Sequence, residues 1–149
     1  MKLICGFILA AMLVASPSQA TPVKSCDRGA PPKEVRIDGC DKLPCQFVRG
    51  KNITAEWDFV VEKDTKILTP DVHATVFGNT VKYPFYQNNA CDTLKDAKCP
   101  LDAGEEVTYQ LNMFVETTFP KVPLDIEFAF LDDHSETVVC FQLSAEIVD

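Results

Sequence analysis

The chain has 149 residues, with 22 acidic and 14 basic side chains, a formal net charge of −8 and seven cysteines. This length fits one domain, and the composition is that of a globular protein rather than a disordered or collagen-like one. The acidic balance, with no cluster of Lys and Arg, argues against nucleic-acid binding, because proteins neutralise phosphates with basic side chains.

The first twenty residues have the pattern of a secretory signal peptide. Lys2 supplies a positive charge, residues 3–15 are uncharged and apolar, and Ser18-Gln19-Ala20 places small residues where signal peptidase cleaves. About thirteen apolar residues are too few for a membrane anchor, which needs roughly 20. We therefore predict cleavage after Ala20, loss of Cys5 with residues 1–20, and one secreted domain over residues 21–149.

Beyond residue 20, apolar residues alternate with polar ones, which is typical of β-strands with one buried face. No segment keeps a helical period over three turns, so we expect at most one helical turn, around residues 92–97. Seven short strands favour an all-β, immunoglobulin-like β-sandwich of two sheets. In chain order, the alternation predicts strands at residues 34–38, 57–61, 71–77, 80–83, 107–115, 126–130 and 139–147.

The cysteines that remain after cleavage are even in number, which behind a secretion signal indicates three disulfides. The rival interpretation is a zinc site, but the cysteine spacing lacks the tight pairs of a zinc finger, and the chain has only two histidines. We therefore expect neither a metal nor a cofactor. Many pairings are open, although short polar loops favour Cys40 with Cys45 and Cys91 with Cys99. The six cysteines are Cys26, Cys40, Cys45, Cys91, Cys99 and Cys140.

One sequon for N-glycosylation is present. Asn52-Ile53-Thr54 matches it and lies in a polar stretch after Gly50, where a loop is expected. Asn52 is therefore the candidate glycosylation site.

Aromatic and proline residues occur in two segments, 81–86 and 119–124, where polar loop residues would be expected. Such a cluster is either a lid packed on the core or the mouth of a pocket, and composition alone favours the core. The inward faces of the predicted strands are also rich in Phe and can either fill a core or line a cavity. The residues concerned are Phe59, Val61, Leu111, Met113, Phe128, Phe130 and Phe141.

The residue pattern does not favour an enzyme. Nucleophilic catalysis usually needs a positioned histidine, whereas His73 falls inside a predicted strand and His134 in the acidic segment 132–136. Asp and Ser are common in exposed turns for backbone reasons, so we interpret that segment as a turn.

The cysteine framework and the aromatic cluster together resemble the ML (MD-2-related lipid-recognition) family, and within it the arthropod Niemann-Pick type C2 proteins. The resemblance covers residues 26–148. It implies disulfides Cys26–Cys140, Cys40–Cys45 and Cys91–Cys99, and non-covalent binding of a lipid between the two sheets. The matching features are Cys26, the pair Cys40 and Cys45, residues 91–100 after Tyr83-Pro84-Phe85, and Cys140 before Phe141.

The resemblance also implies where the lipid enters. It implies that the Phe-rich set named above lines the cavity. Glu116 stands where the vertebrate transporters carry Lys, so the charge at this point of the rim is reversed. The cargo is therefore predicted only as a lipid class: a sterol, a fatty acid or another hydrophobic semiochemical. The expected mouth consists of Tyr83, Pro84 and Phe85 on one side and Val115, Phe119 and Pro120 on the other.

We expect a monomer, outside the cell or in the endosomal or lysosomal lumen, that hands its cargo to a membrane or a receptor. The alternative is a lipid-presenting co-receptor of innate immunity. The sequence lacks the basic mouth that would suit lipid phosphates, which disfavours that alternative.

Overall fold

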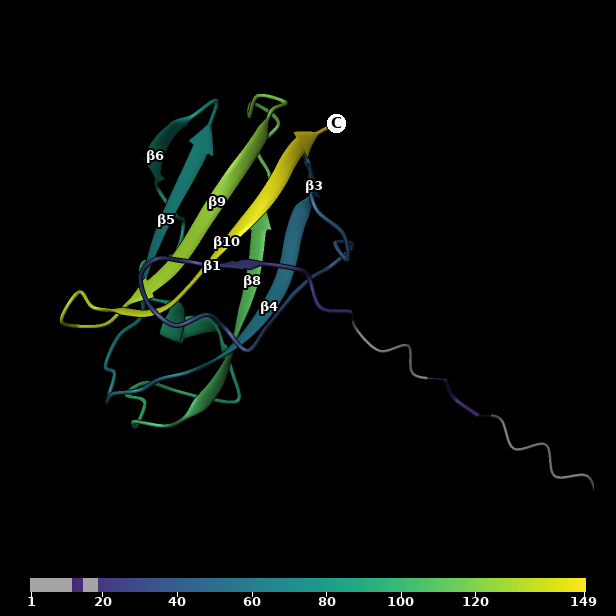
Figure 1. The fold of residues 1–149 in the computed structure, drawn as a ribbon. Coiled ribbons are helices and arrows are strands. Elements are labelled where there is room, and N and C mark those ends of the chain that lie inside the picture. Colours follow the sequence, from purple (N-terminus) through teal and green to yellow (C-terminus); the bar gives the residue numbers. More distant parts are fainter. Residues whose placement is uncertain (1–11, 15–18) are drawn as a thin grey trace, which may run out of the picture.

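The computed structural model describes residues 12–14 and 19–149, and these residues form an almost entirely β structure (Figure 1). The described part contains no helix long and apolar enough to cross a membrane. Most of the predicted signal peptide, residues 1–20, lies outside the described residues. The elements are β1 (Lys24–Ser25), β2 (Glu34–Ile37), β3 (Cys45–Val48), β4 (Asn52–Val60), β5 (Thr69–Val76), β6 (Asn79–Tyr83), the 3₁₀ turn η1 (Ala90–Thr93), β7 (Leu94–Lys95), β8 (Glu106–Phe114), β9 (Pro123–Leu131) and β10 (Thr137–Val148).

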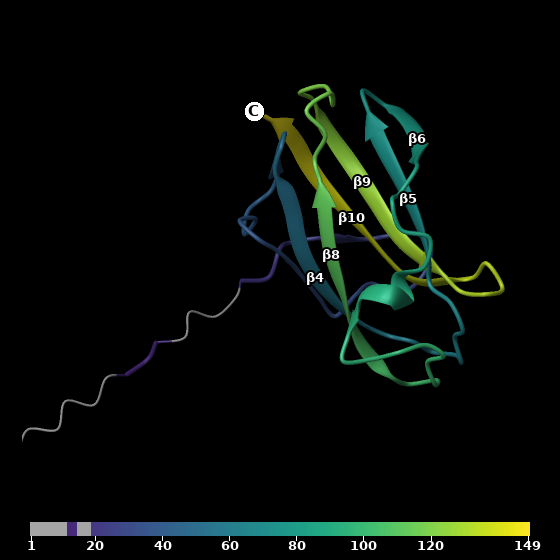
Figure 2. The same cartoon turned by 180° about the vertical axis from the view of Figure 1, so that it is seen from behind.

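Two sheets pack face to face. The larger has the order β1-β10-β9-β5-β6, with β3 pairing parallel to β10, and the smaller has the order β2-β4-β8-β7. Views from opposite sides place β4 and β8 against β5, β9 and β10 (Figures 1 and 2). The predicted β-sandwich is therefore confirmed. In the smaller sheet, β4 buries Ala55, Trp57 and Phe59, because successive side chains of a strand point to opposite faces.

The structure adds three strands to the seven predicted ones. β1 and β7 have two residues each, too few to display an alternation, and β3 has four, of which Cys45 and Phe47 are buried. The predicted helical turn is displaced toward the N-terminus, because Leu94 and Lys95 pair with β8 as β7. Asn52 is not in a loop: it is the exposed first residue of β4, and its side-chain nitrogen donates to Asn112 Oδ1 at 2.8 Å.

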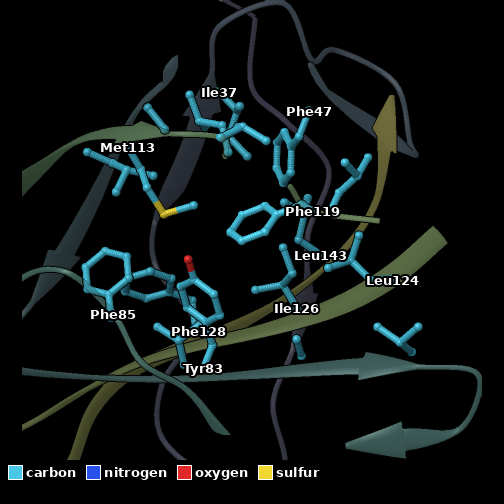
Figure 3. Close-up of a pocket in the computed structure, with 18 of the residues that line it drawn as sticks. Ile37, Phe47, Tyr83, Phe85, Met113, Phe119, Leu124, Ile126, Phe128 and Leu143 are labelled. Carbon is cyan, nitrogen blue, oxygen red and sulfur yellow. The ribbon is translucent and has the colours of Figure 1, made fainter. Parts of the chain in front are cut away.

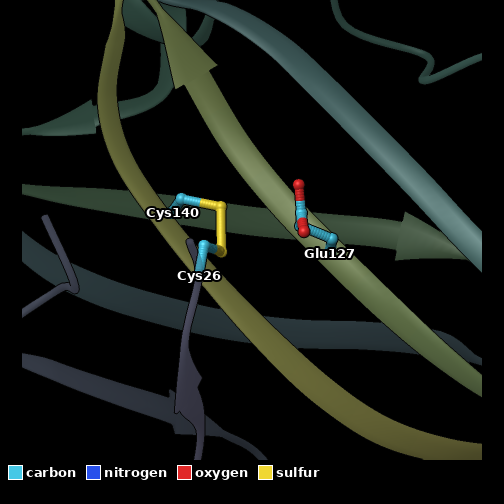
Figure 4. A group of neighbouring side chains, drawn as sticks. All are labelled: Cys26, Glu127 and Cys140. Atoms are coloured by element: carbon cyan, nitrogen blue, oxygen red, sulfur yellow. A yellow bond between two sulfur atoms is a disulfide. The ribbon is translucent and has the colours of Figure 1, made fainter. Parts of the chain in front are cut away.

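All three disulfides have the pairing that the resemblance implies. Cys26–Cys140 spans 114 residues, and Cys40–Cys45 and Cys91–Cys99 close short loops. Figure 4 shows Glu127 beside the Cys26–Cys140 bridge. This group cannot act as a thiolate metal site, because both sulfurs are bonded to each other and Glu127 accepts a hydrogen bond from Arg28 Nε at 2.9 Å.

One end of the sandwich is filled by aromatic rings. The Trp57 ring lies 4.6 Å from Tyr109 and 5.8 Å from Phe130, measured between centroids, and Phe130 lies 5.7 Å from Phe59. All four side chains are at most 1% exposed. A cavity lies between the sheets on one side of this cluster.

Candidate functional site

An apolar cavity of about 220 Å³ lies between the sheets, on the side of the aromatic cluster nearest the N-terminal end of β4. The strands that contribute several side chains, β4, β5, β8, β9 and β10, do so from one face, as the period of two requires. β4 contributes Ile53, Ala55 and Trp57, and β9 contributes Leu124, Ile126 and Phe128. The cavity is therefore a continuation of the hydrophobic core from which side-chain volume is missing.

The floor of the cavity is made of three aromatic rings. Phe128 stands edge-on to Trp57 at 4.8 Å, and Phe141 stands edge-on to it at 5.2 Å. Trp57 is 1% exposed, and its indole Nε1 has no hydrogen-bond partner among the described residues. Edge-to-face packing is a preferred geometry for aromatic pairs, so the floor is a rigid surface for an apolar guest.

The mouth lies between two strand edges. β6 pairs only with β5, and β7 pairs with β8 only at Tyr109 and Thr108, so the rest of that β8 edge is free among the described residues. Tyr83, the last residue of β6, meets Phe119 in the segment after β8, with the ring centroids 6.3 Å apart. Both side chains are half-buried. These two rings therefore stand between the cavity and solvent.

A hydrogen-bonded segment after β6 positions Phe85 at the mouth. Tyr109 Oη donates to Gln87 Oε1 at 2.6 Å, and Gln87 Nε2 donates to Thr93 Oγ1 at 3.0 Å. Burial raises the pKa of Tyr109 far above its ordinary value, so its hydroxyl remains a donor. Held in this way, Phe85 packs edge-on to Phe128 at 5.1 Å.

Tyr83 brings a polar atom to the cavity. Its hydroxyl points toward the space between Met113 and Phe119 (Figure 3). Burial raises the pKa of Tyr83 by desolvating the phenolate, and the negative charge of Glu116 raises it further. The phenol is therefore neutral at physiological pH and can both donate and accept a hydrogen bond.

The structure places most of the predicted site residues at the cavity. Of the predicted mouth, Pro84 is exposed and does not line it, whereas the other five residues do. Of the predicted lining, Leu111, Met113, Phe128 and Phe141 face the cavity. Phe59, Val61 and Phe130 do not: they belong to the filled end of the sandwich, where they are at most 1% exposed.

Sequence reasoning missed lining residues from β2, β3 and β5, and further ones on β4, β9 and β10, such as Trp57, Ile126 and Leu143. Ile37 and Val72 lie in segments that were predicted as strands, so their inward orientation could have been read from the alternation. The orientation of Phe47 could not be read in this way, because β3 was not predicted. β3 pairs in parallel with β10, the last strand.

The acidic segment around His134 is a turn, as predicted. Asp132 Oδ1 accepts the backbone N–H groups of His134 at 2.8 Å and Glu136 at 2.9 Å. His73 lies on the outer face of the larger sheet, in register with Lys82 and Glu127, and therefore away from the cavity.

Comparison with known proteins identifies the fold and the family. A sequence profile of the ML domain matches residues 20–147. The mite group 2 allergen Lep d 2 of Lepidoglyphus destructor is 34% identical over 134 residues, which is 90% of each chain. The NPC intracellular cholesterol transporter 2 of Bos taurus is 24% identical over 139 residues, 91% of this chain and 92% of its own.

A solved structure shares the architecture. The Niemann-Pick type C2 protein from the Japanese carpenter ant superposes with a TM-score of 0.77 at 24% identity, over 85% of this chain and 99% of its own. At that identity the likeness supports the shared sandwich fold.

Proposed function

Because this chain belongs to the ML-domain family, a family of lipid-binding domains, we propose that it is a secreted carrier of one hydrophobic molecule. The cargo is a sterol, a fatty acid or a similar lipid, held non-covalently in the cavity between the sheets. The observation that carries the proposal is the cavity itself: about 220 Å³ surrounded by apolar and aromatic side chains and gated by Tyr83 and Phe119.

Partition out of water supplies the binding energy. Burial of apolar surface contributes about 25 cal/mol per Å², so a ligand that hides roughly 200 Å² gains on the order of 5 kcal/mol before ordering costs. The volume is below the ~300 to 1,000 Å³ that is usual for ligand pockets. A short acyl chain therefore fits the cavity as it stands, whereas a rigid sterol requires the cavity to expand at its mouth.

The mouth is the part that can widen. Tyr83 ends an edge strand, and Phe119 lies in a connection between strands, so neither ring is held by strand neighbours on both sides. The floor, in contrast, is packed from both sheets. We infer that the ligand enters between Tyr83 and Phe119 and that its apolar end rests on Trp57 and Phe128.

The framework of the domain suits an extracellular or lysosomal compartment. Three disulfides form and persist in oxidising surroundings, which agrees with the predicted signal peptide. In this proposal the carrier acts as a monomer and releases its cargo to a membrane or a receptor.

The test is displacement of N-phenyl-1-naphthylamine, a dye that fluoresces in apolar sites, by a series of fatty acids, fatty alcohols and sterols. We expect one dye per protein and displacement by at least one lipid class. Native mass spectrometry of the secreted protein checks the stoichiometry. Absence of dye binding and of lipid binding, with a native circular dichroism spectrum, would refute the proposal.

A further inference from the structure

We propose that the cavity mouth selects lipids with a neutral hydroxyl head group over lipids with a carboxylate, through Tyr83 and Glu116. This inference rests on the proposed function, because it assigns the head group of the same cargo. Its basis is the charge and hydrogen-bonding capacity of the groups around the mouth.

The Tyr83 hydroxyl is the one side-chain oxygen among the described residues that line the cavity. It points into the space between Met113 and Phe119 (Figure 3) and makes no hydrogen bond to another described residue. A ligand hydroxyl placed there can donate to Tyr83 Oη or accept from it, so both groups are satisfied without a charge. An alcohol head therefore replaces the water contacts that it loses on entry.

Glu116 is held at the rim by the backbone of its neighbours. The N–H of Val115 donates to the Lys51 carbonyl at 2.9 Å, and the Val115 carbonyl accepts from Gly50 N at 2.7 Å. The N–H of Phe119, three residues further along the chain, donates to the Glu116 carbonyl at 3.2 Å. Glu116 therefore begins the turn that presents the gating ring of Phe119. Its carboxylate is exposed and forms no ion pair in the described part of the chain.

The cations around the mouth are mostly engaged elsewhere. Arg49 pairs with Asp149 and donates to the Phe119 carbonyl at 3.2 Å. Lys121 Nζ lies 2.5 Å from Asp149 Oδ2, and Lys82 Nζ lies 3.5 Å from Asp71 Oδ1 on the outer face of the sheet.

Lys51, the remaining cation of this region, has an exposed side chain that makes no ion pair with the described residues. It is not a lining residue of the cavity. A carboxylate that enters the mouth thus meets Glu116 and finds no cation among the lining residues. Desolvating an unpaired charge is costly, whereas a hydroxyl needs only the hydrogen bond that Tyr83 offers.

The experiment compares 1-dodecanol with dodecanoate as competitors for N-phenyl-1-naphthylamine at pH 7.5, below the solubility limit of the alcohol and the critical micelle concentration of the acid. The proteins are the wild type, Glu116→Gln, Tyr83→Phe and the control Glu62→Gln. Glu62 is an exposed carboxylate beyond the far end of β4, so its variant has the same change in net charge away from the mouth.

We expect the alcohol to bind the wild type about tenfold more tightly than the acid. Glu116→Gln should improve binding of the acid by about threefold or more, the size expected for a screened charge pair, and leave the alcohol unchanged. Tyr83→Phe should weaken the alcohol by about three- to tenfold, the value of one lost hydrogen bond. Glu62→Gln should change neither.

Equal affinity for the two competitors in the wild type, or tighter binding of the acid, would overturn the selection and leave the carrier function standing. An equal gain in acid binding from Glu62→Gln and Glu116→Gln would also overturn it, because the effect would then come from net charge. Failure of the dye and of both competitors to bind would refute the carrier function itself.

Discussion

The rings of Tyr83 and Phe119 meet edge to face, with their centroids 6.3 Å apart and their planes at 80°. One ring ends β6 in the larger sheet, and the other follows β8 of the smaller sheet. The contact therefore joins the two sheets at the mouth of the cavity, where no strand pairing does so among the described residues.

A charge in place of the gating ring should weaken lipid binding. In Phe119→Asp, a carboxylate replaces an apolar ring beside the cavity, and partition into the cavity loses that apolar contact. We expect the apparent Kd of the bound dye to rise at least tenfold, measured by fluorescence titration. The three disulfides should remain intact by mass spectrometry.

The matched control is Phe114→Asp. Phe114 is 46% exposed, and it points to the outer face because its neighbour Met113 lines the cavity. Binding by this variant should equal that of the wild type. A similar loss in both variants would mean that Phe119 acts through general stability rather than at the mouth.

Trp57 should report directly on ligand contact. It is the one tryptophan of the chain, and it forms part of the cavity floor. A lipid that carries bromine near the end of its chain should quench the emission of Trp57, because bromine quenches on contact. The same lipid without bromine is the control. Emission unchanged by a brominated lipid at saturation would place the ligand outside this cavity.

Unfolding free energy should depend on pH through Asp58. Arg36 binds both carboxylate oxygens of Asp58, at 2.7 and 2.9 Å, and Thr108 Oγ1 donates to Oδ1 at 2.7 Å. These hydrogen bonds, the one to Arg36 foremost, lower the pKa of Asp58 below its ordinary value. The stabilisation is therefore present above the unfolded pKa and is lost as the pH falls through the lower folded pKa.

Asp58→Asn should thus reduce the unfolding free energy by about 1.5 to 3 kcal/mol at pH 7, the usual size for a hydrogen bond to a charged group. Urea denaturation at pH 7 and at pH 2 measures it, and the difference from the wild type should shrink at pH 2. Asp41→Asn, at an exposed position, is the control and should be neutral. An Asp58→Asn effect of equal size at both pH values would contradict the proposed ionic origin.

The long disulfide should stabilise the domain more than a short one does. Cys26–Cys140 closes a loop of 114 residues, and Cys40–Cys45 closes one of 5. On the chain-entropy argument, replacing each pair with Ser costs about 5 and about 2 kcal/mol respectively. Urea midpoints with their slopes would measure both. Equal losses would show that loop entropy does not govern these bridges.

The alternation of apolar residues was enough to predict the two-sheet architecture. Each long strand shows it over several residues, as in Val107 to Val115, and the structure confirms the seven strands. The short strands β1 and β7 escaped because two residues cannot establish a period, and β3 escaped because its pairing partner, β10, is about 100 residues away in the sequence. Asn52 was predicted to lie in a loop because its pairing with Phe114 depends on the register between β4 and β8, which the alternation does not specify.

The sequence by itself determined which side chains point between the sheets and, through its resemblance to the ML family, which cysteines pair. Only the tertiary structure decided what the inward residues do. Phe128 and Phe130 are two positions apart on β9 and point the same way, yet the first faces the cavity and the second lies in the filled end. Periodicity specifies direction, whereas the presence of a cavity depends on how far away the opposite sheet is and on which side chains come from it. That separation is set by the packing of Trp57, Tyr109 and Phe130 across the two sheets.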